Sequence, residues 1–135
     1  MITTEAWQRR ALFLNEPWAK VLIDTLYHYR GSAYLLHEFV IMPDHIHVLI
    51  TPSASLEKAV QFIKGGFSYR LKKELGYWGE VWQPGFSELR VNDRESYLRY
   101  RESIAQNPVR AGLVNSGETF PYCFTHLAKQ RMPAI

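Results

Sequence analysis

The stretch FVIMPDHIHVLITP at residues 39–52 decides how this chain folds. Two apolar segments rich in β-branched residues flank a Met-Pro-Asp sequence at residues 42–44, and both proline and aspartate favour turns. The stretch therefore predicts an antiparallel hairpin, with one strand over residues 33–42 and the next over residues 46–51.

His45 and His47 flank Ile46 at the start of the second predicted strand. Because side chains alternate between the two faces of a strand, both imidazoles point the same way, about 6–7 Å apart along the chain. Ile46 and Val48 then face the core. Two neutral imidazoles on one face suit a single divalent ion. By itself, such a pair more often marks two polar residues on a half-exposed strand than a metal site.

The segment before the hairpin predicts a short strand at residues 2–6 and then a helix. Glu16-Pro17 opens this helix, since proline is favoured at the first helical position. Apolar residues recur at helical spacing as far as about Arg30, and Gly31-Ser32 ends the helix.

After the hairpin, Ser55 is the expected cap of a second helix. Residues 80–91 predict a strand, although a Pro-Gly pair interrupts it. Asn92 is the expected cap of a third helix. We expect that helix to end near Asn107, because Pro108 disfavours helical geometry in the residue before it.

The order strand, helix, strand, strand, helix, strand, helix predicts an α+β fold. It is the split βαβ arrangement of ferredoxin-like folds, with an antiparallel sheet and helices on both faces. The length of 135 residues suits one domain over residues 1–135. The pattern of residues 121–135 does not place this tail.

Composition excludes several classes of protein. An apolar content of 47% excludes a disordered chain, and the single cysteine, Cys123, excludes an internal disulfide. No signal peptide and no membrane-spanning stretch is visible, so we expect a cytoplasmic protein with no membrane partner. The net charge of +3 is uninformative by itself, but residues 57–73 hold five basic residues and one acidic residue, with aromatic residues among them. This segment predicts either a polyanion-binding surface or a solvated helix face.

The last predicted helix carries a second group of candidate site residues. Ser103 and Asn107 lie four residues apart and so share a face, and Tyr100 lies one turn before Ser103. If this helix covers the sheet face that bears the histidines, the side-chain oxygen of Asn107 completes a metal site. Such a site suits Mg²⁺ or Mn²⁺ acting on a phosphate, and also Zn²⁺ or Fe²⁺.

Four ordered blocks of sequence carry a resemblance to a known family. They are MPDHIH at 42–47, IKGGFS at 63–68, VWQ at 81–83 and NPVRAGLV at 107–114. In this order they resemble the REP-associated tyrosine transposases, which are relatives of the IS200/IS605 (Y1) transposases in the HUH endonuclease superfamily. The likeness extends from about Thr3 to His126, nearly the whole chain.

The resemblance implies an HUH nuclease core that cleaves and rejoins single-stranded DNA beside hairpins, as a monomer or a homodimer. A tyrosine hydroxyl attacks a backbone phosphate, and a 5′-phosphotyrosyl enzyme and a free 3′-hydroxyl result. One Mg²⁺ or Mn²⁺ ion, held by His45, His47 and Asn107, polarises the phosphate. The expected DNA contacts are Lys64, Gly65, Gly66, Arg70, Lys72, Lys73, Trp82, Gln83 and Arg110. Among these contacts, Trp82 is expected to stack on an unpaired base, and the glycines to let backbone amides approach a phosphate or to bend the helix.

This chain departs from the family pattern at the nucleophile. The family helix reads Tyr-Ile-x-x-Asn-Pro-Val, whereas residues 103–109 read SIAQNPV, so Ser103 stands at the tyrosine position. A serine hydroxyl lies nearer to the backbone, and its alkoxide is a poorer leaving group for rejoining. Three interpretations follow: lost nuclease activity, a substitution at this position, or takeover by Tyr100, which lies about 4–5 Å away along the helix axis.

Two functions compete with strand cleavage. One is a catalytically inactive module that binds DNA hairpins through the same surface. The other, ranked third, is an unrelated hydrolase that uses His45 and His47 as zinc ligands.

Overall fold

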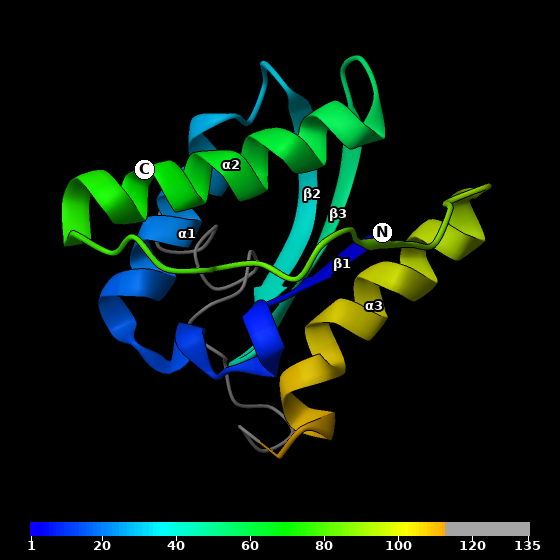
Figure 1. Cartoon of the computed structure of the whole chain (residues 1–135). Coiled ribbons are helices and arrows are strands. Elements are labelled where there is room, and N and C mark those ends of the chain that lie inside the picture. Colours follow the sequence, from blue (N-terminus) through cyan, green and yellow to red (C-terminus); the bar gives the residue numbers. More distant parts are fainter. Residues whose placement is uncertain (113–135) are drawn as a thin grey trace, which may run out of the picture.

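A four-stranded antiparallel sheet forms the centre of the structure, a computed structural model in which residues 1–112 are described (Figure 1). The predicted tail at residues 121–135 lies outside the described residues. The strands are β1 (Ile2–Glu5), β2 (Tyr34–Ile41), β3 (His45–Pro52) and β4 (Ser87–Glu88). The helices are α1 (Glu16–His28), α2 (Leu56–Leu75) and α3 (Arg94–Arg110), with short 3-10 turns η1 (Trp7–Arg9) and η2 (Leu12–Leu14).

The strand order β2-β3-β1-β4 gives the predicted split βαβ topology. β1 and β2 both pair antiparallel with β3, so they run parallel to each other, and α1 connects them. The α+β fold with a ferredoxin-like sheet is therefore confirmed.

The predicted hairpin forms as β2 and β3. Val40 lies opposite His47 and Ile41 lies opposite Ile46. The amide of Met42 donates to the carbonyl of His45 at 2.8 Å, and this bond closes the turn. The hairpin thus fixes both histidines at the end of the sheet where the chain reverses.

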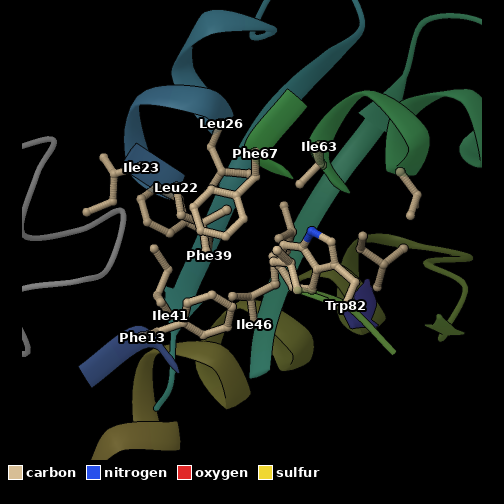
Figure 2. Packing of buried hydrophobic residues seen from close by; sticks show 14 of the residues in the cluster. Phe13, Leu22, Ile23, Leu26, Phe39, Ile41, Ile46, Ile63, Phe67 and Trp82 are labelled. Carbon is tan, nitrogen blue, oxygen red and sulfur yellow. The ribbon is translucent and has the colours of Figure 1, made fainter. Parts of the chain in front are cut away.

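One sheet face is covered by α1 and α2, which enclose the main hydrophobic core (Figure 1). Figure 2 shows Leu22 and Leu26 of α1 and Phe67 of α2 beside Phe39 of β2, in the same cluster as Ile46 of β3. Both helices begin where their caps predict. The side chain of Asn15 accepts from the amide of Trp18 ahead of α1, and Ser55 accepts from Lys58 ahead of α2.

The opposite face is covered by α3 (Figure 1), as the sequence predicts. Ile104 of α3 is buried against Val40 of β2, Met42 of the hairpin turn and Leu49 of β3. This second, smaller core anchors α3 beside the histidines, because Leu49 points to the same face as His47 two residues earlier.

The strand predicted over residues 80–91 is confirmed only in part. Only Ser87–Glu88 pairs with β1, and Trp82 forms an isolated bridge to Ala6. The Pro-Gly pair explains the interruption: Gly85 adopts a φ of 79°, and its carbonyl and that of Gln83 accept from Lys64 instead of joining a strand ladder.

The two predicted limits of the third helix also need correction. Asp93, and not Asn92, caps α3, since its carboxylate accepts from the amide of Ser96 at 2.7 Å. The helix passes through Pro108 to Arg110 because a proline so near the end removes few helical hydrogen bonds. Gly112, in the left-handed region, follows the helix.

None of the helices described between residues 1 and 112 combines the length and the apolar character needed to cross a membrane.

Candidate metal and DNA site

His45 and His47 lie together on the sheet face that α3 covers. Their ring centroids are 4.8 Å apart, with an angle of 78° between the ring planes, and both side chains are half-buried. Ile46 between them is fully buried on the opposite face, so the predicted alternation is confirmed. The two imidazoles are therefore near enough to share one ligand.

Each imidazole is held through its Nδ1 atom. The Nδ1 of His45 lies 2.7 Å from Oδ1 of Asp44, and the Nδ1 of His47 lies 2.7 Å from Oγ1 of Thr3. The carboxylate of Asp44 can only accept, so it fixes the tautomer of His45, whereas the hydroxyl of Thr3, which can donate or accept, fixes the orientation of the His47 ring. Neither contact uses an Nε2 atom. Both Nε2 atoms are thus left for a ligand.

Asp44 is itself held in place by Arg9. The guanidinium lies 3.0 Å from Oδ2 of Asp44 and 3.1 Å from Oε1 of Glu5. Burial alone would raise the pKa of Asp44, but the hydrogen bonds and charges of His45 and Arg9 outweigh it and lower that pKa. Asp44 is therefore a carboxylate at neutral pH, and accepts from His45.

Arg9 reaches Asp44 from an unusual backbone conformation. Gln8 and Arg9 both have a φ of 55°, in the left-handed region that non-glycine residues seldom adopt. The side chain of Gln83 accepts from the amide of Gln8 at 2.7 Å and holds this turn. Strained backbone of this kind persists where the surrounding structure fixes it, often at functional sites.

His47 is suited to metal binding by its protonation state. Burial, and then the proximity of His45, lowers the pKa of His47 to about 4. The imidazole is therefore neutral at pH 7 and keeps the lone pair that a metal requires.

The helix α3 brings the other predicted residues to this face. Tyr97 packs edge-on against His37 with ring centroids 5.6 Å apart, and Ile104 lies on Met42, so the helix runs along β2 toward the histidine end of the sheet. Successive helical residues turn by about 100°, which puts three half-buried side chains on one flank of Ile104. They are Tyr100, Ser103 and Asn107.

The donor set fits a divalent cation with mixed ligands. Among residues 1–112, no third His, Cys, Asp or Glu joins the histidine pair to form a metal-holding group. Glu5 lies opposite His45 in the β1–β3 register, but its carboxylate holds Arg9. A third side-chain ligand from the described residues would have to be an amide or hydroxyl oxygen, and Asn107 of α3 carries an oxygen of that kind. Coordination by Asn107 stays a prediction.

The prediction that Trp82 stacks on an unpaired base is wrong. Its ring is buried, 5.5 Å from the rings of both Phe13 and Phe67, and its Nε1 donates to the carbonyl of Lys64 at 3.0 Å (Figure 2). An aromatic ring in the core cannot offer its face to a base. Sequence alone does not distinguish a core tryptophan from a stacking one.

Lys64 and Gln83 both support the loop that follows α2. The Nζ of Lys64 donates to the carbonyls of Gln83 and Gly85, each at 2.8 Å, and burial lowers its pKa. Most of the donors of this ammonium are thus used within the protein, which leaves less for a phosphate.

The two glycines of α2 differ in their surroundings. A Cβ atom at Gly66 would lie 2.7 Å from the ring of Tyr29, so Gly66 permits the close packing of α1 and α2. A Cβ at Gly65 would meet nothing within 4 Å. The predicted bend is wrong, because α2 is continuous through both residues, and amides within a helix already donate to its carbonyls.

The remaining basic candidates do not gather at the histidines. Arg70, Lys72 and Lys73 lie on α2, which covers the opposite sheet face, with Lys72 and Lys73 exposed. Arg110 is the last residue of α3. The described structure therefore separates the candidate metal ligands from the basic residues of α2.

Three residues of this site were not predicted from the sequence. Asp44 was interpreted only as a turn former, although its position directly before His45 is a usable signal. Thr3 and Arg9 reach the histidine region only through the pairing of β1 with β3 and through the turn at Gln8. No local pattern in the sequence reveals such contacts.

Comparison with known proteins identifies the family of this chain. A sequence model of the family described as Transposase IS200 like matches residues 4–107. A curated relative from Haemophilus influenzae, provisionally named as a REP-associated tyrosine transposase, is 29% identical over 98 residues. This match covers 64% of the chain and 56% of the relative, so the chain spans little more than half of that relative's length. The resemblance inferred from the four sequence blocks is confirmed.

Two solved structures share the fold. A REP-associated tyrosine transposase bound to a REP hairpin superposes with a TM-score of 0.77 at 21% identity, over 96% of this chain and 78% of the other. A provisionally assigned transposase from Deinococcus radiodurans superposes with a TM-score of 0.56 at 24% identity, over 76% and 86% of the two chains. At these identities the similarity establishes the arrangement of helices and strands.

Proposed function

The chain belongs to the IS200-like transposase family, and from this premise we propose that it binds single-stranded DNA beside hairpins at the face bearing His45 and His47. The observation that carries the proposal is the orientation of this pair. Both Nδ1 atoms have hydrogen-bond partners, and both Nε2 atoms are left for a metal ion that meets a phosphate. The fold neighbour described above is bound to a REP hairpin, which supports a DNA partner of this kind.

The metal proposed for the site is Mg²⁺ or Mn²⁺, held by His45, His47 and Asn107. When bound, such an ion supplies Lewis-acid polarisation of a phosphate oxygen and a template for the DNA backbone. Asp44 and Thr3 orient the histidines, and α3 closes the site on one side.

The proposed reaction of the family scaffold is strand transfer. A tyrosine oxygen forms a bond to the phosphorus as the bond from phosphorus to the 3′-oxygen breaks, and the 3′-hydroxyl that leaves can reverse the step. Ser103 occupies the tyrosine position of this chain. Its Oγ lies several ångströms nearer to the α3 backbone than a phenol oxygen would, and a misplacement of about 1 Å can already cost about 100-fold in rate. We therefore propose that the chain binds hairpin DNA but forms the covalent intermediate inefficiently.

A second candidate nucleophile follows from the position of Tyr100. It is half-buried and lies on the same flank of α3 as Ser103 and Asn107. Cleavage by Tyr100 would make the chain an active nuclease in its present form.

A labelled hairpin oligonucleotide with unpaired flanks distinguishes these possibilities. We would incubate it with Mn²⁺ and the natural chain, Ser103→Tyr, and Ser103→Tyr with His47→Ala, and measure binding by mobility shift and covalent capture on denaturing gels. The proposal expects binding by the natural chain without an adduct, an adduct for Ser103→Tyr, and none after His47→Ala.

Other outcomes have defined meanings. An adduct with the natural chain that Tyr100→Phe abolishes would assign the nucleophile to Tyr100. Failure of the natural chain to bind any hairpin or single strand would refute the proposal. Tight zinc binding with hydrolysis of a small ester would favour the unrelated hydrolase. A cytoplasmic location and either a monomer or a homodimer fit the proposed function.

A further inference from the structure

An exposed stripe of aromatic and basic side chains runs along the face of α2 that points away from the core. Residues of α2 at spacings of three and four return to the same side of the helix. The outer stripe of α2 consists of Lys58, Phe62, Tyr69, Lys72 and Lys73, and Trp78 in the following loop extends it.

The aromatic residues of the outer stripe are unusually exposed. Phe62 is 46% exposed, Tyr69 is 63% exposed and Trp78 is 76% exposed. Large apolar side chains gathered on a surface mark interaction sites, whereas isolated ones need no explanation. These positions are opposite to Ile63, Phe67 and Leu71, which α2 buries against the sheet, so core packing does not require aromatic residues there.

Each ring of the outer stripe has a basic or an aromatic side chain as its neighbour. The Nζ of Lys72 lies 5.4 Å from the ring centre of Trp78, and the Nζ of Lys73 lies 6.0 Å from that of Tyr69. Phe62 stacks on Tyr29, with ring centroids 5.0 Å apart and planes tilted by 31°. Each exposed ring is thus placed beside a cation or a second ring.

Two hollows of the surface meet at Tyr69. One lies over the first part of α2, between Phe62 and Tyr69, and the other is lined by Tyr69, Lys72, Lys73 and Trp78. Tyr69 borders both, so the two hollows follow one another along the helix with Tyr69 between them, and we refer to the pair as the track.

Gly65 leaves bare backbone in the middle of this track. It costs a helix about 1 kcal/mol relative to alanine. Unlike Gly66, which Tyr29 approaches closely, Gly65 has no neighbour in the described structure that a Cβ atom would displace. The backbone of Gly65 therefore lines the hollow between Phe62 and Tyr69, where a flat group can approach the helix.

Charge along the track favours a polyanion. Lys58, Lys72 and Lys73 lie on it, whereas the two acidic residues of α2, Glu57 and Glu74, lie to either side when the residues are placed at about 100° intervals. Flat rings interspersed with cations suit the bases and phosphates of an unpaired DNA strand.

We propose that unpaired bases flanking the DNA hairpin stack on Tyr69, Trp78 and Phe62, while Lys58, Lys72 and Lys73 contact the phosphates of the same strand. This inference rests on the proposed binding of hairpin DNA and adds a second contact surface to it. The surface lies on α2, on the other side of the sheet from His45 and His47, so its occupant is a different part of the DNA from the strand at the histidines.

The test compares two oligonucleotides that share one hairpin, one with blunt ends and one with a short unpaired extension. Dissociation constants come from fluorescence anisotropy at fixed salt. Tyr69→Ala and Trp78→Ala should each weaken binding of the extended hairpin by about 5- to 160-fold, as expected for the loss of one base–aromatic stack, and leave the blunt hairpin unchanged. Tyr69→Phe and Trp78→Phe keep a stacking ring and should bind like the natural chain.

Leu35→Ala is the matched control, because Leu35 is 56% exposed on β2 and is not part of the outer stripe. It should bind both oligonucleotides like the natural chain. An extension that carries 5-iodouracil should crosslink to Tyr69 or Trp78 under ultraviolet light, as read by peptide mapping.

The results separate failure of the stripe from failure of the proposed function. Unchanged affinity of both alanine variants for the extended hairpin, with the natural chain still binding, overturns the stripe and leaves the proposed function standing. A natural chain that binds neither oligonucleotide overturns both. A change in oligomer mass by light scattering in Tyr69→Ala or Trp78→Ala would make the stripe a contact between copies of the chain, and would also overturn the inference.

Discussion

Removal of the carboxylate of Asp44 is expected to weaken divalent-metal binding at the histidine pair by about 10- to 100-fold, or about 1.4–2.7 kcal/mol. The Oδ1 of Asp44 lies 2.7 Å from Nδ1 of His45, and Arg9 holds the other carboxylate oxygen at 3.0 Å. In Asp44→Ala, the imidazole of His45 loses the partner that fixes both its tautomer and its ring orientation. It also loses a negative charge that raises the basicity of Nε2.

A control is needed because Asp44→Ala also removes a charge from the region. Glu5→Gln removes a charge of the same sign, from a residue that lies opposite His45 in the sheet and also binds Arg9. Within the described residues, the carboxylate of Glu5 accepts no hydrogen bond from His45 or His47. Asp44→Asn is intermediate, since its amide oxygen can still accept from Nδ1 without the charge.

The assay is titration of the DNA-free protein with Mn²⁺, with free ion read by electron paramagnetic resonance and affinity checked by calorimetry. Expected affinities fall in the order natural chain and Glu5→Gln, then Asp44→Asn, then Asp44→Ala. Far-ultraviolet circular dichroism confirms folding of each variant. Equal losses in Glu5→Gln and Asp44→Ala would refute the orientation argument, because a general charge effect would then account for both.

Three further predictions concern stability and are measured by urea unfolding. Gly65→Ala should raise the free energy of unfolding by up to about 1 kcal/mol, because the added Cβ atom meets no neighbour. Gly66→Ala should give no such increase, because its Cβ atom would lie 2.7 Å from the ring of Tyr29. Ile104→Ala should lower the free energy of unfolding by about 2–5 kcal/mol and weaken the packing of α3. Leu98 is 47% exposed on the same helix, so Leu98→Ala should change the free energy of unfolding by about 0.5 kcal/mol or less. Lys64→Met should lower it by about 1–3 kcal/mol through loss of two hydrogen bonds from a charged donor, with little change in the salt dependence of DNA binding.

The fold was predictable wherever local patterns decide it. The hairpin at residues 39–52 depends on alternation and turn residues that are adjacent in sequence, and the starts of α1 and α2 depend on single caps. Most of the strand predicted at residues 80–91 does not form, because Lys64 of α2 donates to the carbonyls of Gln83 and Gly85 that a strand would pair. An interaction across some twenty residues leaves no trace in the local pattern.

The candidate site divides in the same way. His45 and His47 were predictable because a spacing of two places side chains on one strand face. Thr3 was not, since its contact with His47 depends on the register between β1 and β3, 44 residues apart in sequence. The stacking role of Trp82 was implied by the resemblance, and the sequence around it does not show whether its ring lies in the core or on the surface.

The hydrogen bonds of the histidine pair and the residue at position 103 are independent features of the site. The hydrogen bonds at Asp44 and Thr3 orient the imidazoles of His45 and His47, and they do not involve Ser103, the proposed nucleophile position. Ser103 is half-buried on the flank of α3 beside Ile104, and it is not part of the hydrophobic cluster through which the helix packs on the sheet. Binding and chemistry can therefore be lost separately in this fold. Ser103→Tyr is expected to change covalent capture of DNA while the dissociation constant stays the same, and a parallel change in both would mean that position 103 contributes to DNA binding itself.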